Sequence, residues 1–411
     1  MARLAGSSRL LRAINEVAAL AHLLESGPLT RADLRELTGL SKPTTSEVLR
    51  RLTDAGLAAV VGRTSGGPGP NAEVYSANPD AAFAAAVSVR ESVGAAQPGL
   101  AVGVCDLTGE LRVRTEVRVD FRATDPVTAV TDAVADACRQ GDIPPELVGH
   151  VQLGVPGSYD EHSDTIHHVD VPGWHRPGLI GDLRARLAGT VGVDNDVNLA
   201  AIAERTRGVA AAEGGFALLW LGEGLGLAID LGGTLLRGAR GGAGEIGYMP
   251  VGLAGPDGQR DLQDLIGGGA VVALAKEHGI RARSAAAVVA KAAAAIRDAD
   301  ADRDGAQRFL AAFAERVAFG LAAVVAVLDP PMVVLAGDVA QAGGQPLRDA
   351  VAAAAATATS LETSVAVTAV ADDAVLLGAL DAGLVAVRDA LFASLQHAAN
   401  PPAAAARAAG A

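Results

Sequence analysis

The chain has 411 residues, half of them hydrophobic and 49 of them glycine, which predicts two or three domains with a large core and many tight turns. No stretch approaches the roughly 20 uninterrupted apolar residues of a membrane span. The N-terminus also lacks a signal-peptide core, so we expect a cytoplasmic protein without a membrane partner. Two cysteines, Cys105 and Cys138, exclude a disulfide framework and a cysteine-based metal site.

The net charge of −13 hides an asymmetry along the chain. Residues 1–65 hold nine basic and six acidic side chains, a net charge of +3, so the other 346 residues carry −16. A small basic segment on an acidic body is typical of a protein in which one module contacts the phosphates of nucleic acid while the rest stays away from them.

Three helices are predicted in this basic segment. The first ends at Ser26-Gly27-Pro28, and its apolar stripe comprises Leu10, Ile14, Val17, Ala21 and Leu24. The second begins at Thr30, turns Leu34 and Leu37 inward and ends at Gly39. The third is capped by Ser41 and ends at Gly56, with a predicted buried face of Thr45, Val48, Leu49 and Leu52.

Two strands are expected next, at 57–61 and 72–75, joined by the glycine- and proline-rich turn 66–71. This order of elements predicts a winged helix-turn-helix that binds DNA. The outward residues of the third helix would contact DNA, the first four at base edges and the two arginines at phosphates, with one more arginine in the wing: Lys42, Thr44, Ser46, Glu47, Arg50, Arg51 and Arg63. Glu47 can accept a hydrogen bond from cytosine N4. The alternative is an ordinary three-helix unit whose charges are only solvated.

From Pro79 onward, short strands alternate with alanine-rich helices, which predicts an α/β body. Strands are expected at 101–105, 111–119, 151–155, 191–194, 216–221, 227–231 and 333–335, and a helix from Asn195 through Glu204. The alanine- and proline-rich residues 398–411 are expected to form a disordered tail.

Six motifs follow one another in this body: Gly154-Val155-Pro156-Gly157, Gly173-Trp174, the run 193–198 (Val-Asp-Asn-Asp-Val-Asn) with Ala203-Glu204, the run 222–226 (Gly-Glu-Gly-Leu-Gly), the run 241–249 (Gly-Gly-Ala-Gly-Glu-Ile-Gly-Tyr-Met), and the run 328–337. In this order they resemble the ROK family (repressors, open reading frames and kinases), and the run 40–45 looks like the DNA-binding helix of ROK repressors. The resemblance covers residues 10–390. It implies an actin/hexokinase-like pair of lobes with a ligand cleft between them.

The resemblance also implies the ligand residues. Asp196 matches the general base of ROK sugar kinases, while Asn195 and Glu245 match residues that contact the sugar. For Asn195 and Asp196 a plain helix cap remains the alternative. Tyr248 stands where the family has a histidine and Gln263 where it has a glutamate, and both can still hydrogen-bond hydroxyl groups.

Three departures argue against catalysis and against metal. The family's phosphate loop, Asp-x-Gly-Gly-Thr, should lie near 87–103, but residues 87–94 contain no aspartate, glycine pair or threonine; the same letters at 230–234 are interpreted as a chance match in a turn. The second phosphate hairpin carries Glu223, a like charge beside a phosphate. The zinc-binding histidine and cysteines are missing, and the adjacent His167 and His168 are interpreted as solvated.

We therefore expect an α/β chain with a winged helix-turn-helix (residues 1–78), a small lobe (79–195 plus about 376–397) and a large lobe (196–375). The expected function is a homodimeric or homotetrameric transcriptional regulator, a repressor by family resemblance, whose partners are operator DNA and a sugar or sugar derivative. No catalytic residue, cofactor or metal is expected. A regulator with no small-molecule effector, and a ROK sugar kinase with an extra domain, remain the alternatives.

Overall fold

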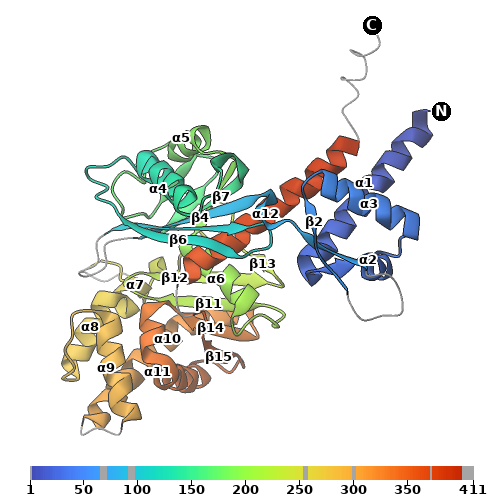
Figure 1. Cartoon of the computed structure of the whole chain (residues 1–411). Coiled ribbons are helices and arrows are strands. Elements are labelled where there is room, and N and C mark those ends of the chain that lie inside the picture. Colours follow the sequence, from blue (N-terminus) through green and yellow to red (C-terminus); the bar gives the residue numbers. More distant parts are fainter. Residues whose placement is uncertain are drawn as a thin grey trace.

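Three bodies follow one another along the chain in the structure, a computed structural model that describes residues 2–64, 72–90, 98–252, 258–298, 302–370 and 373–399. Figure 1 shows a small N-terminal module beside two lobes, each built on its own sheet, with the long helix α12 (Ala374–Ala399) running from between the lobes to the N-terminal module.

The N-terminal module is a three-helix unit with a small sheet. Its elements are α1 (Ala2–Ser26), β1 (Leu29–Thr30), α2 (Arg31–Thr38), α3 (Lys42–Asp54), β2 (Ala58–Arg63) and β3 (Glu73–Ala77), with strand order β1-β3-β2. The predicted caps are present: Thr30 and Asp33 form a capping box, Gly39 ends α2 in the left-handed region, and the Ser41 hydroxyl accepts from the Thr44 amide. The buried face of α3 is the predicted one, Thr45, Val48, Leu49 and Leu52.

Two details of the sequence prediction for this module were wrong. Leu37 is 47% exposed, because the short helix α2 buries only Leu34. The stripe predicted for α1 is not its inner face: Leu10 and Ile14 are exposed, and Ala13, Ala19, Leu20 and Leu23 are buried instead. α1 is apolar on several sides and packs against α2, α3 and α12, so periodicity alone did not identify its inner face. The strand β1 was not predicted, and the turn 66–71 lies outside the described residues.

The small lobe has a five-stranded sheet of order β10-β7-β4-β5-β6. Its strands are β4 (Phe83–Arg90), β5 (Gly99–Asp106), β6 (Leu111–Arg118), β7 (Val148–Val155) and β10 (Thr190–Asn195). One face is covered by α4 (Pro126–Gln140) and α5 (Leu179–Arg186), and the other by α12. Ala84 and Ala86 of β4 face α12, so the helix lies close to the sheet. The short elements β8 (Ser158–Asp160), β9 (Thr165–His167), η1 (Pro79–Ala81) and η2 (Pro145–Leu147) complete the lobe.

The large lobe has a second five-stranded sheet, of order β13-β12-β11-β14-β15. Its strands are β11 (Phe216–Leu221), β12 (Leu225–Leu231), β13 (Thr234–Leu235), β14 (Met332–Ala336) and β15 (Ser364–Val367). One face packs on a core from η3 (Ile246–Tyr248), α7 (Leu262–Ile266), α8 (Gly268–Glu277), α9 (Ala285–Arg297), α10 (Arg303–Leu328) and α11 (Gly337–Ala358). α10 is long and apolar enough to cross a membrane by length and composition, but half of its most apolar stretch is buried in this core.

The other face of this sheet is covered by α6 (Asp196–Arg207), which also packs along α12. The two lobes therefore meet through a pair of helices, α12 on the small-lobe sheet and α6 on the large-lobe sheet. The helices lie very close together at Gly378, where an added Cβ would lie 1.7 Å from the carbonyl oxygen of Leu199.

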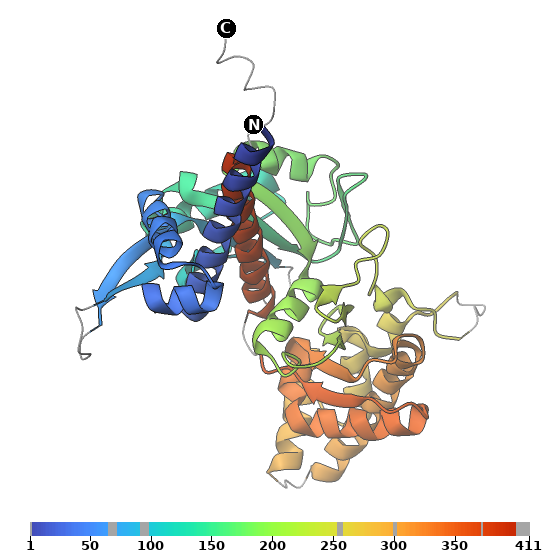
Figure 2. The ribbon, with the colours of Figure 1, turned by 90° about the vertical axis from the view of Figure 1, so that its right-hand side faces the viewer.

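Beyond the lobes, α12 continues to the N-terminal module. Leu391, Phe392 and Leu395 pack against the core of that module, and Figure 2 shows α12 and α1 lying side by side. α12 extends to Ala399, two residues into the segment predicted as a tail, and the rest of that segment lies outside the described residues.

Because no room exists for a side chain at the α6–α12 crossing, Gly378→Ala should lower the melting temperature by several degrees, the effect of an overpacking cost of about 1–3 kcal/mol. Gly383→Ala on the same helix is the control, since its nearest neighbour would be Ala84 Cβ at 3.4 Å, an ordinary contact. Calorimetry of the full chain checks both. Equal melting temperatures for the two variants would contradict the crossing geometry.

Candidate functional site

The exposed face of α3 brings together the residues predicted to contact DNA. Lys42, Ser46, Glu47 and Arg50 are exposed, and Arg51 is partly buried. The Thr44 hydroxyl lies 2.8 Å from that of Ser41, so it belongs to the helix cap. Arg63 is exposed on β2, with its guanidinium 3.9 Å from Glu73. The structure thus places Lys42, Ser46, Glu47 and Arg50 on an exposed helix face and Arg63 on an adjoining strand, and their contacts with DNA stay a prediction.

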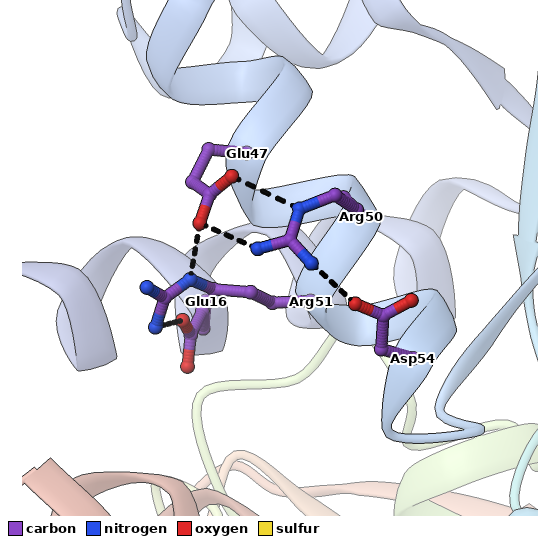
Figure 3. A network of polar contacts seen from close by, with 5 residues as sticks. All are labelled: Glu16, Glu47, Arg50, Arg51 and Asp54. Atoms are coloured by element: carbon purple, nitrogen blue, oxygen red, sulfur yellow. Dashed lines mark hydrogen bonds and ion pairs between the residues drawn. The ribbon is translucent and has the colours of Figure 1, made fainter.

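Glu47 holds both arginines of this helix, as Figure 3 shows. Its Oε1 accepts from Arg50 Nη2 at 2.8 Å and from Arg51 Nε at 2.7 Å, and its Oε2 accepts from Arg50 Nε at 3.1 Å. Arg50 also donates to Asp54, and Arg51 lies 3.5 Å from Glu16 of α1. The hydrogen bonds from Arg50 and then Arg51 lower the pKa of Glu47 to about 2, so this carboxylate is ionised at neutral pH.

A second site lies between the lobes, in a cleft of about 1280 Å³. Its walls come from β4, β5 and β6 of the small lobe and from β11, β12, η3, α7 and α11 of the large lobe, and the first turn of α12 lines it as well. All five residues predicted to contact a ligand, Asn195, Asp196, Glu245, Tyr248 and Gln263, are among its lining residues.

Asn195 is the N-cap of α6. Its Oδ1 accepts from the amides of Val197 and Asn198, and its Nδ2 donates to the carbonyl oxygen of Gly157 at 3.1 Å. The cap interpretation therefore describes the side chain in this structure, and the cap fixes the loop at Gly157 as well. Asp196, the first residue of α6, lies at the cleft wall. The hydrogen bonds of Asn195 to the α6 amides and to Gly157 hold this end of the helix in place.

Glu245 is half-buried beside the cleft. In the part of the chain that the structure describes, no group hydrogen-bonds to its carboxylate, and burial raises its pKa. Gly244 before it adopts φ +92°, and an added Cβ there would lie 1.7 Å from the carbonyl oxygen of Leu227. Glycine at 244 thus lets this turn pack against β12 and presents Glu245 to the cleft.

Tyr248 and His168 form an aromatic wall next to Glu245. Their ring centroids are 4.7 Å apart, and His168 adopts a left-handed φ of 58°. Desolvation, followed by the charges of Glu245, Asp170 and Asp261, raises the pKa of the Tyr248 phenol. His168 and Asp170, both cleft residues, were missed by the sequence reasoning, which treated His168 as a solvated loop residue. The only available signal was their position five and three residues before Gly173 of the Gly173-Trp174 motif.

Gln263 lines the cleft, but both ends of its amide already contact backbone. Nε2 donates to the carbonyl oxygen of Glu223 at 2.8 Å, and Oε1 accepts from the Leu225 amide at 3.2 Å. Gln263 thus holds the turn 222–226 against α7, and a hydroxyl ligand would have to share or displace these bonds.

The far end of the cleft, near the first hairpin and the turn 222–226, is rich in carboxylates. An added Cβ at Gly268 would lie 2.3 Å from Oε2 of Glu223, so this carboxylate lies against the N-terminus of α8. Burial raises the pKa of Asp338 at the start of α11. Arg90, at the end of β4, is paired with Glu116 at 3.1 Å and with Asp373. Residues 91–97, which include part of the predicted loop, lie outside the described residues.

The run 230–234 lies away from the cleft. Asp230 is buried, pairs with Arg205 and accepts from the Gly233 amide at 2.8 Å in the turn between β12 and β13. Asp230 therefore stabilises this turn, and the run 230–234 is not a phosphate loop in the cleft, as predicted. Among the described residues no group of three or more histidine, cysteine or acidic side chains is arranged to hold a metal ion.

Comparison with known proteins gives two family matches. A model described as the ROK family matches residues 94–384, and a model described as the MarR family matches residues 11–66. Similar curated proteins include the xylose repressor of Bacillus spizizenii, 23% identical over 253 residues (60% of this chain, 62% of that protein). They also include the glucokinase of Halalkalibacterium halodurans, 29% identical over 174 residues (40% of this chain, 51% of that protein). The chain thus spans between half and two thirds of the length of these relatives.

Solved structures agree on the fold. A ROK family transcriptional regulator, described as a homologue of the E. coli MLC protein, superposes with a TM-score of 0.69 at 17% identity, over 95% of this chain and 99% of that one. The ROK hexokinase of Thermus thermophilus gives a TM-score of 0.60 at 25% identity, over 75% of this chain and 99% of that one. The predicted fold, a winged helix-turn-helix on a two-lobed α/β body, is confirmed. The chain belongs to the ROK family, with a MarR-type helix-turn-helix at its N-terminus.

Proposed function

We propose that this protein is a transcriptional repressor that binds operator DNA through α3 and whose cleft senses a carbohydrate or a related small molecule. The observation that carries the proposal is α12, one helix that lines the cleft at its first turn and packs on the DNA-binding module at its last turns. The MarR-type module and the similarity to xylose repressors support it.

The chemistry of the cleft supports a polyhydroxylated ligand. Glu245 offers an acceptor without a protein partner among the described residues, and Tyr248 and His168 offer a ring face for the apolar side of a sugar. Asp196 adds a second carboxylate at the start of α6. Directional acceptors beside an aromatic wall are suited to hydroxyl groups on a ring.

We further propose that the protein is not a kinase. A triphosphate in the cleft would lie near Glu223 and Asp338, and Arg90 is already paired with Glu116 and Asp373. Like charges at close range oppose phosphate binding. Because some relatives are kinases, sugar-kinase activity is the second candidate function. Its evidence would be the formation of a sugar phosphate by the wild type and the loss of this activity in Asp196→Asn.

Signal transmission follows from the helix packing. Because α6 covers the large-lobe sheet and α12 the small-lobe sheet, closing the cleft would shift one helix against the other at Gly378. α12 would carry this shift to Leu391, Phe392 and Leu395 under the DNA-binding module. In a cytoplasmic homodimer or homotetramer on a palindromic operator, such a shift changes the spacing of two modules and thus DNA affinity. A regulator without an effector would have the same α12 but no ligand response.

Glu245→Gln tests the ligand site. A carboxyl whose pKa is raised in the folded state costs stability once it ionises, so the variant should melt higher at neutral pH, and the gain should disappear as the pH falls below the ordinary glutamate pKa of 4.5.

The same variant should lose the thermal shift given by a cognate sugar, which at about 100 times its dissociation constant adds roughly 2.7 kcal/mol to the wild type. The screen covers hexoses, amino sugars, pentoses, disaccharides and sugar phosphates, with and without ATP–Mg²⁺. The exposed Glu161→Gln is the control. A screen without any hit would favour the regulator with no effector, and a shift with ATP–Mg²⁺ alone would favour the kinase.

Lys42→Ala and Arg51→Ala test the facing of α3 toward DNA. Lys42→Ala should relax sequence preference, because Lys42 stands at the N-terminal turn that enters the major groove. Arg51→Ala should weaken binding to every duplex and reduce the salt slope by about one unit, the effect of one lost phosphate contact. Fluorescence anisotropy on several duplexes at varied salt distinguishes them. A change of base preference in Arg51→Ala with an unaltered slope would reverse the assignment.

Phe392→Ala tests the connection through α12. The variant should keep the sugar-induced thermal shift while its DNA affinity no longer responds to the sugar, because the contact between α12 and the N-terminal module is weakened. Val385→Ala, an exposed apolar residue on the same helix, should leave both responses intact. A normal DNA response in Phe392→Ala would rule out this contact as the connection.

A further inference from the structure

The recognition helix carries fewer available positive charges than its composition suggests. α3 contains three basic residues, Lys42, Arg50 and Arg51, and two acidic ones, Glu47 and Asp54, so its net charge is only +1. Both arginines are hydrogen-bonded to Glu47, which lies three and four residues before them on the same helix face (Figure 3). The arginine side chains that would contact phosphates are thus already paired with a carboxylate.

DNA binding requires these pairs to be exchanged. A phosphate that binds the Nε–H side of Arg50 or Arg51 competes with the Glu47 carboxylate, because these N–H groups already donate to it. Once the arginines leave, Glu47 faces the negative surface of the duplex without a counter-charge. Binding to an arbitrary sequence therefore carries a like-charge penalty.

One feature of the major groove removes this penalty. Cytosine presents its N4 amino group, a hydrogen-bond donor for a carboxylate, without an acceptor beside it on the same base. Adenine presents its N6 amino donor next to the N7 acceptor, guanine offers only acceptors, and thymine offers an acceptor and a methyl group. Glu47 lies on the exposed face of α3, between Ser46 and the two arginines, where a carboxylate can turn from the arginines toward a base edge.

We propose, resting on the proposed DNA-binding function, that Glu47 is a specificity-determining residue that pairs with Arg50 and Arg51 and releases them to phosphates without a like-charge penalty only where the duplex presents a cytosine to its carboxylate. Glu47 thus contributes more by weakening binding to other sequences than by strengthening binding to the operator. Asp54 also pairs with Arg50, but at the C-terminal end of the helix, and it has no part in base reading.

The test is selection from a random-sequence duplex library with the full-length wild type, Glu47→Gln and Asp54→Asn. Each side chain is exposed, and each substitution removes one negative charge with little change in shape. The wild type and Asp54→Asn should enrich duplexes with a cytosine at one fixed position of each half-site. Glu47→Gln should lose that preference and keep the preferences at other positions.

Anisotropy titrations on the enriched duplex and on its scrambled version then give the magnitude. In Glu47→Gln, affinity for the scrambled duplex should rise, its salt slope should steepen by about one unit, and the ratio of enriched to scrambled affinity should fall at least about ten-fold. Asp54→Asn should raise both affinities together and keep the ratio.

Two outcomes would overturn the proposal. If the wild type selects a consensus and Glu47→Gln selects the same one with the same affinity ratio, Glu47 has no role in specificity, while the DNA-binding function stands. If the wild type enriches no consensus at all, the DNA-binding function and the role of Glu47 fall together.

Discussion

The contact between α6 and α12 is the constraint on which the rest of the molecule depends. Each helix covers one sheet, so their packing sets the angle between the lobes and with it the shape of the cleft. At Gly378 the helices approach so closely that no Cβ fits, so a shift between them would be a switch between two discrete packings rather than a gradual slide. Since α12 continues to the DNA-binding module, one helix contacts both proposed sites.

Charge placement is the second theme of the structure. The body keeps carboxylates where phosphates would enter the cleft, at Glu223 and Asp338, and the recognition helix keeps one beside its arginines, at Glu47. In both places a carboxylate of the protein disfavours the binding of phosphates: those of a nucleotide in the cleft, and those of a duplex that offers Glu47 no cytosine. The DNA-binding module tolerates this cost because its selectivity is a difference between affinities for two sequences, and weaker binding to the wrong one serves as well as stronger binding to the right one.

Local signals made the N-terminal module predictable. Thr30 and Asp33, Gly39 and Ser41 marked the ends of α2 and α3, and the buried face of α3 followed from its period. The inner face of α1 could not be predicted from its period. Its partner α12 lies more than 300 residues later in the chain, and the period of α1 carries no information about that contact. The order of motifs predicted that Asn195, Asp196 and Glu245 contact a ligand, and all three line the cleft. His168 was not, since a left-handed loop residue that reaches Tyr248 has no local signature.

The most direct test of the central claim is reciprocal linkage between the two sites. The dissociation constant of the enriched duplex is measured at rising concentrations of the sugar that binds the cleft, and that of the sugar is measured with and without saturating duplex. If α12 couples the sites, the two affinities change by the same factor, expected to be at least about five-fold. A sugar that fills the cleft and leaves duplex affinity unchanged would contradict the account.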